Sequence, residues 1–524
     1  MENRGPEPSA RLSRAGWILT TLRRLPALRA HAGLSLAYLL SRYLLDRAGM
    51  RLNLILDWMF INDPADLRDR LLETLYYGHG FPPGMNLVTG VLMKISDSPV
   101  AAAHALFQLL GLVMVNSLLY LGRALGLSWA AALALAVAFA LSPQVIWFEH
   151  LYIYEIPVVS LLCLAAACLH AAVQKPSFWR WAGCFLCCAA IGWIRSSFHL
   201  VWFGTVVGLG FWFAGTGHRR QVLLAAIGPA VLLLAVYVKN LVVFGVFGAL
   251  TWGVGSLTTA TIRNMDPQLR DKWVQRGKLS RYAALSVYSG PRDYLPFFPS
   301  SENPRWPPMM NVLERPSLGA PNFNHWFFLE INRRRREDAL VYLKERPLEY
   351  AATVALNTVE FFSPSTRWHP YDDRPDSPHF KHRLVLGRWE SLYDRIVHQV
   401  LLPPVGLYLF LPVAFGWALV RARIFYRTRS TAGAGRAALL AFSLLSIAYV
   451  TVSGVMVAFG EAPRYRFQID PVIWLIAALA VSDLWRAIRR WAGDCRRRRL
   501  ALSRQAGRFA GRCRVQLLGR EGKP

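Results

Sequence analysis

The sequence predicts an all-α protein that crosses a membrane about ten times. Hydrophobic residues make up 54% of the 524 residues. They gather in runs close to the roughly 20 residues that a helix needs to span the hydrocarbon core. Short connections rich in Lys and Arg alternate along the chain with longer ones that hold acidic and aromatic residues. This composition and segmentation are typical of polytopic membrane proteins and exclude a disordered chain.

The N-terminal half divides into a basic arm, residues 1–31, and a transmembrane module, residues 32–249. Within the module, a polar first external loop covers residues 46–86. The apolar run 83–95 is too short to span, so we expect it to lie at the membrane surface. The ten predicted spans of the whole chain are 32–45, 101–121, 127–148, 156–173, 179–194, 199–214, 222–243, 397–420, 437–459 and 471–487.

A long polar region, residues 250–396, separates the module from the C-terminal spans, which lie within 397–487. It is too long for a passive loop and rich in Pro, Trp and Tyr. Apolar residues at near-helical spacing predict a helical stretch from about Asn332 to Phe361. We therefore expect an external cap, followed after the last spans by a basic tail, residues 488–524.

The distribution of positive charge predicts the orientation. The formal net charge of +28 comes largely from Arg and Lys in the arm, the tail and alternate short loops. Such loops stay in the cytoplasm, so both termini are expected there and the acidic loops outside. Topology thus accounts for the charge without a nucleic acid partner. We expect a bacterial inner membrane protein whose active site faces the periplasm.

The first external loop carries three candidate site residues. Asp63 precedes Pro64 and a helical run, so it is either a catalytic base or simply the cap of that helix. Asp57 adjoins apolar residues, where a carboxylate is costly to place. His79 lies between glycines ahead of a Pro-Pro pair, and it could bind a substrate phosphate or have only a structural role.

Further candidates lie near the same predicted membrane face. Glu149, in an aromatic turn between two spans, is a second candidate for base or metal ligand. Arg195 and His199 separate two apolar runs, and Lys239 lies at the end of another. These cations could pair with Glu149 or Asp63 or hold a lipid phosphate; the alternative is anchoring at the interface.

The connection between the last two spans reads Gly-Glu-Ala-Pro-Arg-Tyr-Arg-Phe-Gln-Ile-Asp-Pro, residues 460–471. Arg464 and Arg466 alternate around Tyr465, so an extended backbone would point both guanidinium groups to one side. Arg is the side chain best shaped to grip phosphate oxygens. Glu461 could orient them. We expect this segment to bind an anionic lipid phosphate.

Three stretches together resemble the GT-C superfamily of membrane glycosyltransferases that use polyprenyl-phosphate sugars, including protein mannosyltransferases and aminoarabinose transferases. They are the acidic loop 57–73, the His-x-x-Pro-Pro of residues 79–83, and Glu-x-x-Arg-Tyr-Arg from Glu461. The resemblance implies a GT-C-like fold and an inverting transfer with the donor phosphate as leaving group. The role of base maps best to Asp63, with Asp57 as rival. Many members carry a tandem acidic pair after the first helix, where this chain has Arg51-Leu52-Asn53.

The resemblance also implies the partners. They are a polyprenyl-phosphate sugar donor and a lipid, glycan or protein acceptor, met on the non-cytoplasmic face. Some members use a divalent cation, although no ligand set here requires one. Two other functions remain open from sequence: a transporter or flippase of a lipid-linked glycan, and a non-catalytic scaffold that binds lipid phosphate. We expect Asp63 and Arg464 to share one pocket.

Overall fold

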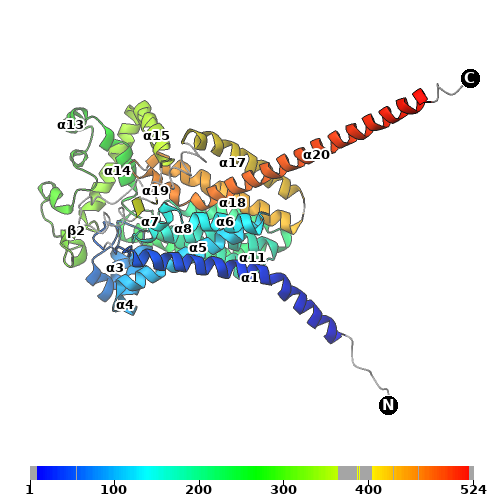
Figure 1. Cartoon of the computed structure of the whole chain (residues 1–524). Coiled ribbons are helices and arrows are strands. Elements are labelled where there is room, and N and C mark those ends of the chain that lie inside the picture. The colour runs from blue at the N-terminus through cyan, green and yellow to red at the C-terminus, as the bar shows by residue number, and fades with distance from the viewer. Residues whose placement is uncertain are drawn as a thin grey trace, which may run out of the picture.

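The computed structural model describes residues 9–54, 56–363, 386, 387, 389, 404–428, 430–457 and 459–518. These residues form a bundle of helices with a cap at one end (Figure 1). The bundle consists of α1 (Ser9–Arg47), α5 (Pro99–Ala124), α6 (Trp129–Ala140), α7 (Pro143–Glu149), α8 (Glu155–Gln174), α9 (Phe178–Ile194), α10 (Leu200–Phe213), α11 (Arg219–Phe244), α17 (Pro404–Arg427), α18 (Thr431–Val457), α19 (Ala462–Phe467) and α20 (Asp470–Leu518).

Serine side chains and prolines start several bundle helices. Ser128, Ser142 and Ser177 each accept a hydrogen bond from an amide in the first turn of α6, α7 and α9. Pro99 and Pro143 occupy first-turn positions of α5 and α7, where a missing N–H costs nothing. These residues set where each apolar run begins to coil, so the helices begin close to the predicted positions.

By length and composition, five described helices could cross a membrane, or six if the bent pair α6–α7 counts as one span. The five are α5, α8, α11 with the 3-10 turn that precedes it, α18 and the first half of α20. The axes of α6 and α7 meet at 53°. An all-α membrane protein is therefore confirmed, whereas ten spans stay a prediction, since α1, α9, α10 and α17 do not meet the same criterion.

Two helices at the chain ends are longer than expected. The predicted arm and first span form one helix, α1, which begins at Ser9, and α20 continues from the last span through the tail to Leu518. Both project from the end of the bundle opposite the cap (Figure 1). The first-loop helices are α2 (Pro64–Asp69), α3 (Leu71–Tyr77) and α4 (Gly84–Ile95). α4 has the 12 residues of an apolar helix too short to span.

The cap contains short helices and one antiparallel hairpin. The predicted helical stretch from Asn332 is two helices, because the chain breaks at Arg346 before Pro347. In the predicted cap, residues 364–385, 388 and 390–396 lie outside the described part, as do 397–403 of the next predicted span. The cap elements are α12 (Gly253–Ala260), α13 (Pro267–Gln275), α14 (Phe327–Glu345), α15 (Pro347–Phe361), β1 (Glu314–Arg315), β2 (Ala320–Pro321) and 3-10 turns at Ile262–Asn264, Arg281–Ala284, Pro291–Phe297 and Pro308–Met310.

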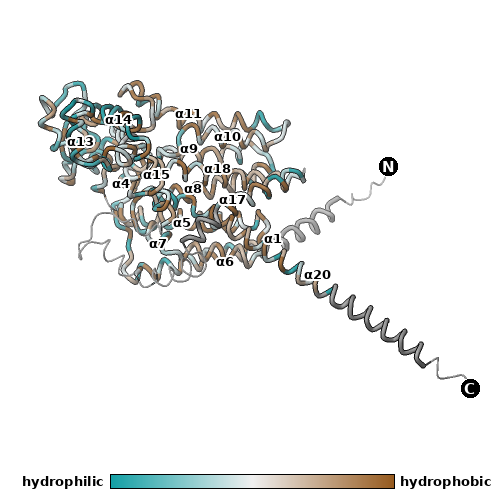
Figure 2. Tube along the Cα trace, turned by 90° about the horizontal axis from the view of Figure 1, so that it is seen from above, coloured by the Kyte–Doolittle hydropathy of each residue, from teal (hydrophilic) through white to brown (hydrophobic). Residues whose placement is uncertain are grey.

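The apolar core is divided between the two parts. One continuous cluster runs through the bundle. The cap holds an aromatic cluster, which includes Trp252, Tyr294 and Phe328, and a smaller one around Trp273 and Tyr342. Figure 2 shows the same division in the hydropathy of the chain, with hydrophobic residues along the bundle helices and hydrophilic residues concentrated around α13 and α14. The boundary between the two parts is where a membrane surface would meet the cap.

Candidate functional site

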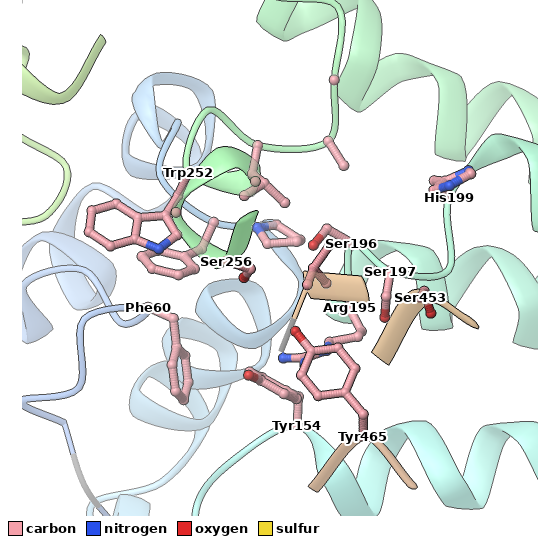
Figure 3. Close-up of a pocket in the computed structure, with 18 of the residues that line it drawn as sticks. Phe60, Tyr154, Arg195, Ser196, Ser197, His199, Trp252, Ser256, Ser453 and Tyr465 are labelled. Atoms are coloured by element: carbon pink, nitrogen blue, oxygen red, sulfur yellow. The ribbon is translucent and has the colours of Figure 1, made fainter. Parts of the chain in front are cut away.

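A cavity of about 590 Å³ lies where the bundle meets the cap. Its walls come from segments far apart in the sequence, and Figure 3 shows the side chains that face into it. They belong to the first external loop (Trp58–Phe60), the α9–α10 connection (Arg195–His199), α12 with the residues before it, the end of α18, and the turn into α19. The fold therefore brings the first loop, the cap and the last helices together around one cavity.

The cavity has a polar side and an apolar side. The polar residues of the lining include Ser196, Ser197, Ser256, Arg195, Arg464 and Glu461. The apolar side includes Leu200, Val201, Tyr237 and Phe247. Val201 and Phe247 are 67% and 59% exposed. A molecule with a polar head and an apolar tail fits both sides.

Arg195 is held at the polar side by two aromatic rings. Its guanidinium carbon lies 4.1 Å from the centroid of the Tyr154 ring and 4.2 Å from that of Tyr465. The residue is only 8% exposed, yet its Nη2 has no hydrogen-bond partner among the described residues. Stacking between two tyrosines fixes the plane of the guanidinium without using its N–H groups.

Arg464 lies beside Arg195 but is paired. Its Nη2 donates to Glu461 Oε2 at 2.7 Å and to the Tyr154 hydroxyl at 2.6 Å. Its Nε lies 3.1 Å from Oε1 of the fully buried Glu155, an ion-pair distance. Neither oxygen of Glu155 has a hydrogen bond among the described residues, so this contact is electrostatic. Arg464 thus neutralises two carboxylates, one in the cavity wall and one behind it.

The predicted geometry of Arg464 and Arg466 is wrong. The segment is not extended but helical, α19, so residues two apart point to different sides. Arg466 points away from the cavity: it donates to Asp470 Oδ1 at 3.0 Å and to the carbonyls of Phe361 and Ser363 at 3.2 and 2.7 Å. It therefore ties the end of α15 to α19, while Arg464 and Tyr465 line the cavity.

A tight turn joins α9 to α10 at the cavity. The amide of Phe198 donates to the carbonyl of Arg195 at 3.1 Å. His199 caps α10 by accepting a hydrogen bond from the amide of Val201. The Tyr449 hydroxyl donates to the carbonyl of Ser197 at 2.7 Å and braces the turn from α18.

Asp63 lies outside this cavity. It is 5% exposed and accepts hydrogen bonds from the amide of Ala65 at 2.9 Å and from the amide and hydroxyl of Ser317 at 2.9 and 2.6 Å. It thus caps α2 and binds the cap hairpin. The prediction that Asp63 and Arg464 share one pocket is wrong, because Asp63 lines only a small separate depression. Asp57 is exposed and is not among the lining residues either.

Arg315, which sequence reasoning missed, holds the first loop against the cap. It is 2% exposed and donates to the carbonyls of Leu56, Trp58 and Ile61 at 2.9, 3.0 and 2.7 Å, and also to that of Asp57. No motif in the sequence indicates this role, because the partners are backbone carbonyls rather than side chains. The guanidinium thereby shapes the cavity wall that Trp58 and Phe60 form.

Glu149 is buried in the bundle, away from the cavity. Its Oε2 accepts from Arg42 Nε at 2.7 Å, and its Oε1 accepts from the Tyr38 hydroxyl at 2.8 Å. The partner of Glu149 is thus Arg42, whereas the sequence offered Arg195, His199 and Lys239 as possible partners. Gly111 makes room for this group, because a Cβ there would lie 2.2 Å from both Glu149 Oε1 and the Tyr38 hydroxyl. The contact joins α1, α5 and α7.

His79 and Lys239 connect the first loop to the cap and to α11. The Nδ1 of His79 lies 2.8 Å from the Thr251 hydroxyl and its Nε2 lies 3.1 Å from the carbonyl of Asn324, and burial lowers its pKa to about 3. Lys239 Nζ donates to the carbonyl of Gly78 at 2.5 Å, just after α3. Neither residue lines the cavity.

The donor set at the cavity does not fit a divalent cation. Such ions prefer several oxygen ligands, usually including more than one carboxylate. Among the described lining residues Glu461 supplies the only carboxylate, and it is paired with Arg464. Elsewhere in the described part of the chain, no group of three or more His, Cys, Asp or Glu residues is arranged to hold a metal.

Comparison with known proteins adds no family. No family model matches the chain, and no curated protein is similar to it in sequence.

Proposed function

We propose that the protein is a membrane glycosyltransferase that moves a sugar from a polyprenyl-phosphate donor to a lipid, glycan or protein acceptor. The observation that carries the proposal is the two-sided cavity between bundle and cap. Two of its apolar lining residues, Val201 and Phe247, are largely exposed, and its polar lining residues include serines, a guanidinium with an unpartnered nitrogen and a carboxylate. A lipid-linked sugar phosphate has the same division. The resemblance of the loop motifs to GT-C enzymes supports the same reading.

Glu461 is our candidate for the catalytic base. In the proposed step, an acceptor hydroxyl attacks the anomeric carbon while its proton passes to the Glu461 carboxylate. The bond between the anomeric carbon and the phosphate oxygen breaks, and its electron pair leaves with the polyprenyl phosphate. Asp63, Asp57 and Glu149 offer no carboxylate to the cavity. In the resting protein the Glu461 carboxylate is paired with Arg464, whose Nη2 lies 2.7 Å from Oε2.

The test is transfer by the purified protein in lipid nanodiscs. Radiolabelled polyprenyl-phosphate sugars are offered with a membrane extract as acceptor source. We expect labelled product from the wild type and a loss of about a hundredfold or more in Glu461→Gln, since general base catalysis supplies about that factor. Glu302→Gln, an exposed position of the cap, is the matched control.

Two results would contradict the proposal. Unchanged turnover in Glu461→Gln, with loss in Asp63→Asn or Asp57→Asn, would return the role of base to the first loop. If the wild type moved a lipid-linked glycan between leaflets but transferred no sugar to an acceptor, the protein would be a transporter and not an enzyme.

A further inference from the structure

We infer that the turn from Arg195 to His199, with the N-terminus of α10, is a phosphate-binding subsite that takes the phosphate headgroup of a lipid. The inference deepens the proposed function and rests on it only for the sugar that the lipid carries. Of the two places where the sequence suggested a lipid phosphate, it assigns anion recognition to the α9–α10 connection and not to the Arg464 segment.

The first support is the state of Arg195. A guanidinium buried to more than nine-tenths would normally make hydrogen bonds with most of its N–H groups. Arg195 instead stacks between the rings of Tyr154 and Tyr465, and its Nη2 has no partner in the described part of the chain. Both rings and the guanidinium lie together at one wall of the cavity (Figure 3). The side chain is preorganised for a planar, bidentate contact with an oxyanion.

The second support is the turn itself. The Ser197 hydroxyl is buried and also lacks a hydrogen-bond partner among the described residues, while its carbonyl is occupied by Tyr449. Leu200 and Val201, the first residues of α10, line the cavity together with Ser196 and Ser197. The 14-residue helix therefore presents its positive end here. An unpartnered hydroxyl, an unpartnered guanidinium nitrogen and a helix N-terminus therefore belong to residues of the same cavity wall.

The neighbouring cations are committed elsewhere. Arg464 binds Glu461, Glu155 and Tyr154, and Arg466 binds Asp470 and two carbonyls outside the cavity. Lys239 donates to the carbonyl of Gly78. A phosphate at Arg464 would have to displace a carboxylate, whereas a phosphate at Arg195 would give a hydrogen-bond partner to a nitrogen that lacks one among the described residues. We therefore assign phosphate binding to Arg195.

The apolar side indicates a lipid source for the phosphate rather than a free ion. Leu200 and Val201 continue from the turn along α10 toward the bundle surface, where Val201 is largely exposed. A tail bound there would extend directly from a headgroup at Ser197. Free phosphate would fill only the polar end and would leave this apolar wall uncovered.

The experiment measures binding without transfer. Purified full-length protein in nanodiscs is titrated with a long-chain polyprenyl monophosphate, with the corresponding polyprenol and with inorganic phosphate, and bound ligand is read by native mass spectrometry. We expect the polyprenyl phosphate to bind more tightly than the alcohol. The affinity should fall about tenfold to a hundredfold in Arg195→Met and about threefold to tenfold in Ser197→Ala. Arg276→Met, an exposed change on the cap, should bind as the wild type does.

Ser197→Ala keeps the test valid if Arg195→Met fails to fold, because it removes one hydroxyl and adds no bulk. Competition by inorganic phosphate that depends on Arg195 would support the subsite and show that the anion alone suffices. Equal affinity for the polyprenyl phosphate and the polyprenol, or wild-type affinity in both variants, would overturn the proposed subsite. Binding that depends on the lipid phosphate, without transfer of any sugar, would refute the glycosyltransferase and leave the subsite supported. Sugar transfer with unchanged donor affinity in both variants would support the glycosyltransferase and refute the subsite.

Discussion

At the scale of single residues, burial decides which charged groups are structural. Arg42 and Glu149 are 1% and 3% exposed, and Arg42 also donates to the carbonyl of Ala140 at 2.8 Å. A charge removed from water in this way is stable only with its partner present. The cost of losing one member is therefore much larger than for an ion pair on the cap surface.

Replacing Glu149 by Gln should destabilise the fold by about 3 kcal/mol or more, because it leaves the Arg42 guanidinium buried beside a neutral group. Turnover per folded molecule should stay close to that of the wild type, since Glu149 does not reach the cavity. Chemical unfolding in detergent and transfer assays on the folded fraction measure the two effects. The control, Glu337→Gln, breaks only exposed pairs with Arg333 and Arg334 and should cost less than about 1 kcal/mol. A folded but inactive Glu149→Gln protein would restore its catalytic candidacy.

The lowered pKa of His79 predicts that the free energy of unfolding falls in mild acid. Its folded-state pKa of about 3 lies below the ordinary value of 6.5, so the unfolded chain binds the proton first as the pH falls. The stabilisation is complete above about pH 6.5 and is lost progressively below it. Between about pH 7.5 and about pH 5 the wild type should lose about 2 kcal/mol more than His79→Gln, measured as unfolding free energies. Equal losses in both proteins would show that His79 is not the group responsible.

The site residues show what sequence can and cannot supply at this scale. Asp63 was expected either as base or as helix cap, and the cap is confirmed by its bond to the amide of Ala65. Arg195 and His199 were selected because charge between two apolar runs is costly. The partner of Glu149 could not be chosen, because several cations lay at plausible distances in the chain and only packing identifies Arg42.

At the scale of elements, the cap hairpin and the first loop behave as one unit. The Arg315 guanidinium collects four carbonyls of residues 56–61, and Ser317 binds Asp63. The loop is also tied to the bundle, since Phe60 and Ile61 are buried in its core and Asn86 donates to the carbonyl of Phe60. Its position beside the cavity is therefore set by the cap and the bundle together.

Replacing Arg315 by Met should loosen the wall that Trp58 and Phe60 form. We expect the KM for the lipid donor to rise several-fold, about 1–2 kcal/mol in binding, and residues 56–63 to become sensitive to proteolysis. The control is Arg292→Met, which breaks only the surface pair with Glu314 in the same hairpin. An unchanged KM together with a protected loop would show that the wall does not depend on this guanidinium.

Helix positions were largely predictable, and helix breaks were not. Apolar runs placed α5 and α8 within three residues of the observed bounds and α18 within six, because burial of an apolar run acts locally. The bend between α6 and α7 and the helical form of α19 were missed. Both depend on how a short segment packs against distant helices, as Phe148 of α7 does with Phe467 of α19, whose rings lie 4.4 Å apart.

At the scale of the whole molecule, the bundle has two unlike ends. The cap and the cavity occupy one end, and the basic halves of α1 and α20 extend from the other (Figure 1). The sequence predicted this sorting through the alternation of basic and acidic connections, since charge placement depends on the membrane rather than on packing. It could not predict the cavity, whose walls meet only after the helices assemble.

The native cysteine in α20 tests the orientation. Cys495 is partly exposed beyond the last apolar turn, whereas Cys163, Cys184 and Cys188 are buried in the bundle. A membrane-impermeant maleimide should leave intact cells unlabelled and should label the protein after permeabilisation. A Cys495→Ser, Cys513→Ser double variant removes both tail thiols and is the control. Labelling of intact wild-type cells that the double variant abolishes would place the tail outside and reverse the orientation.

The clamp at Arg315 also has a consequence for biosynthesis. The carbonyls that it binds precede it by 254 to 259 residues, so they leave the ribosome long before their partner exists. Tyr449, Arg464 and Tyr465, which complete the cavity, emerge later still. A chain released before α18 and α19 would insert most of its helices yet possess no finished pocket, so ligand occupancy would report that synthesis had reached its final helices.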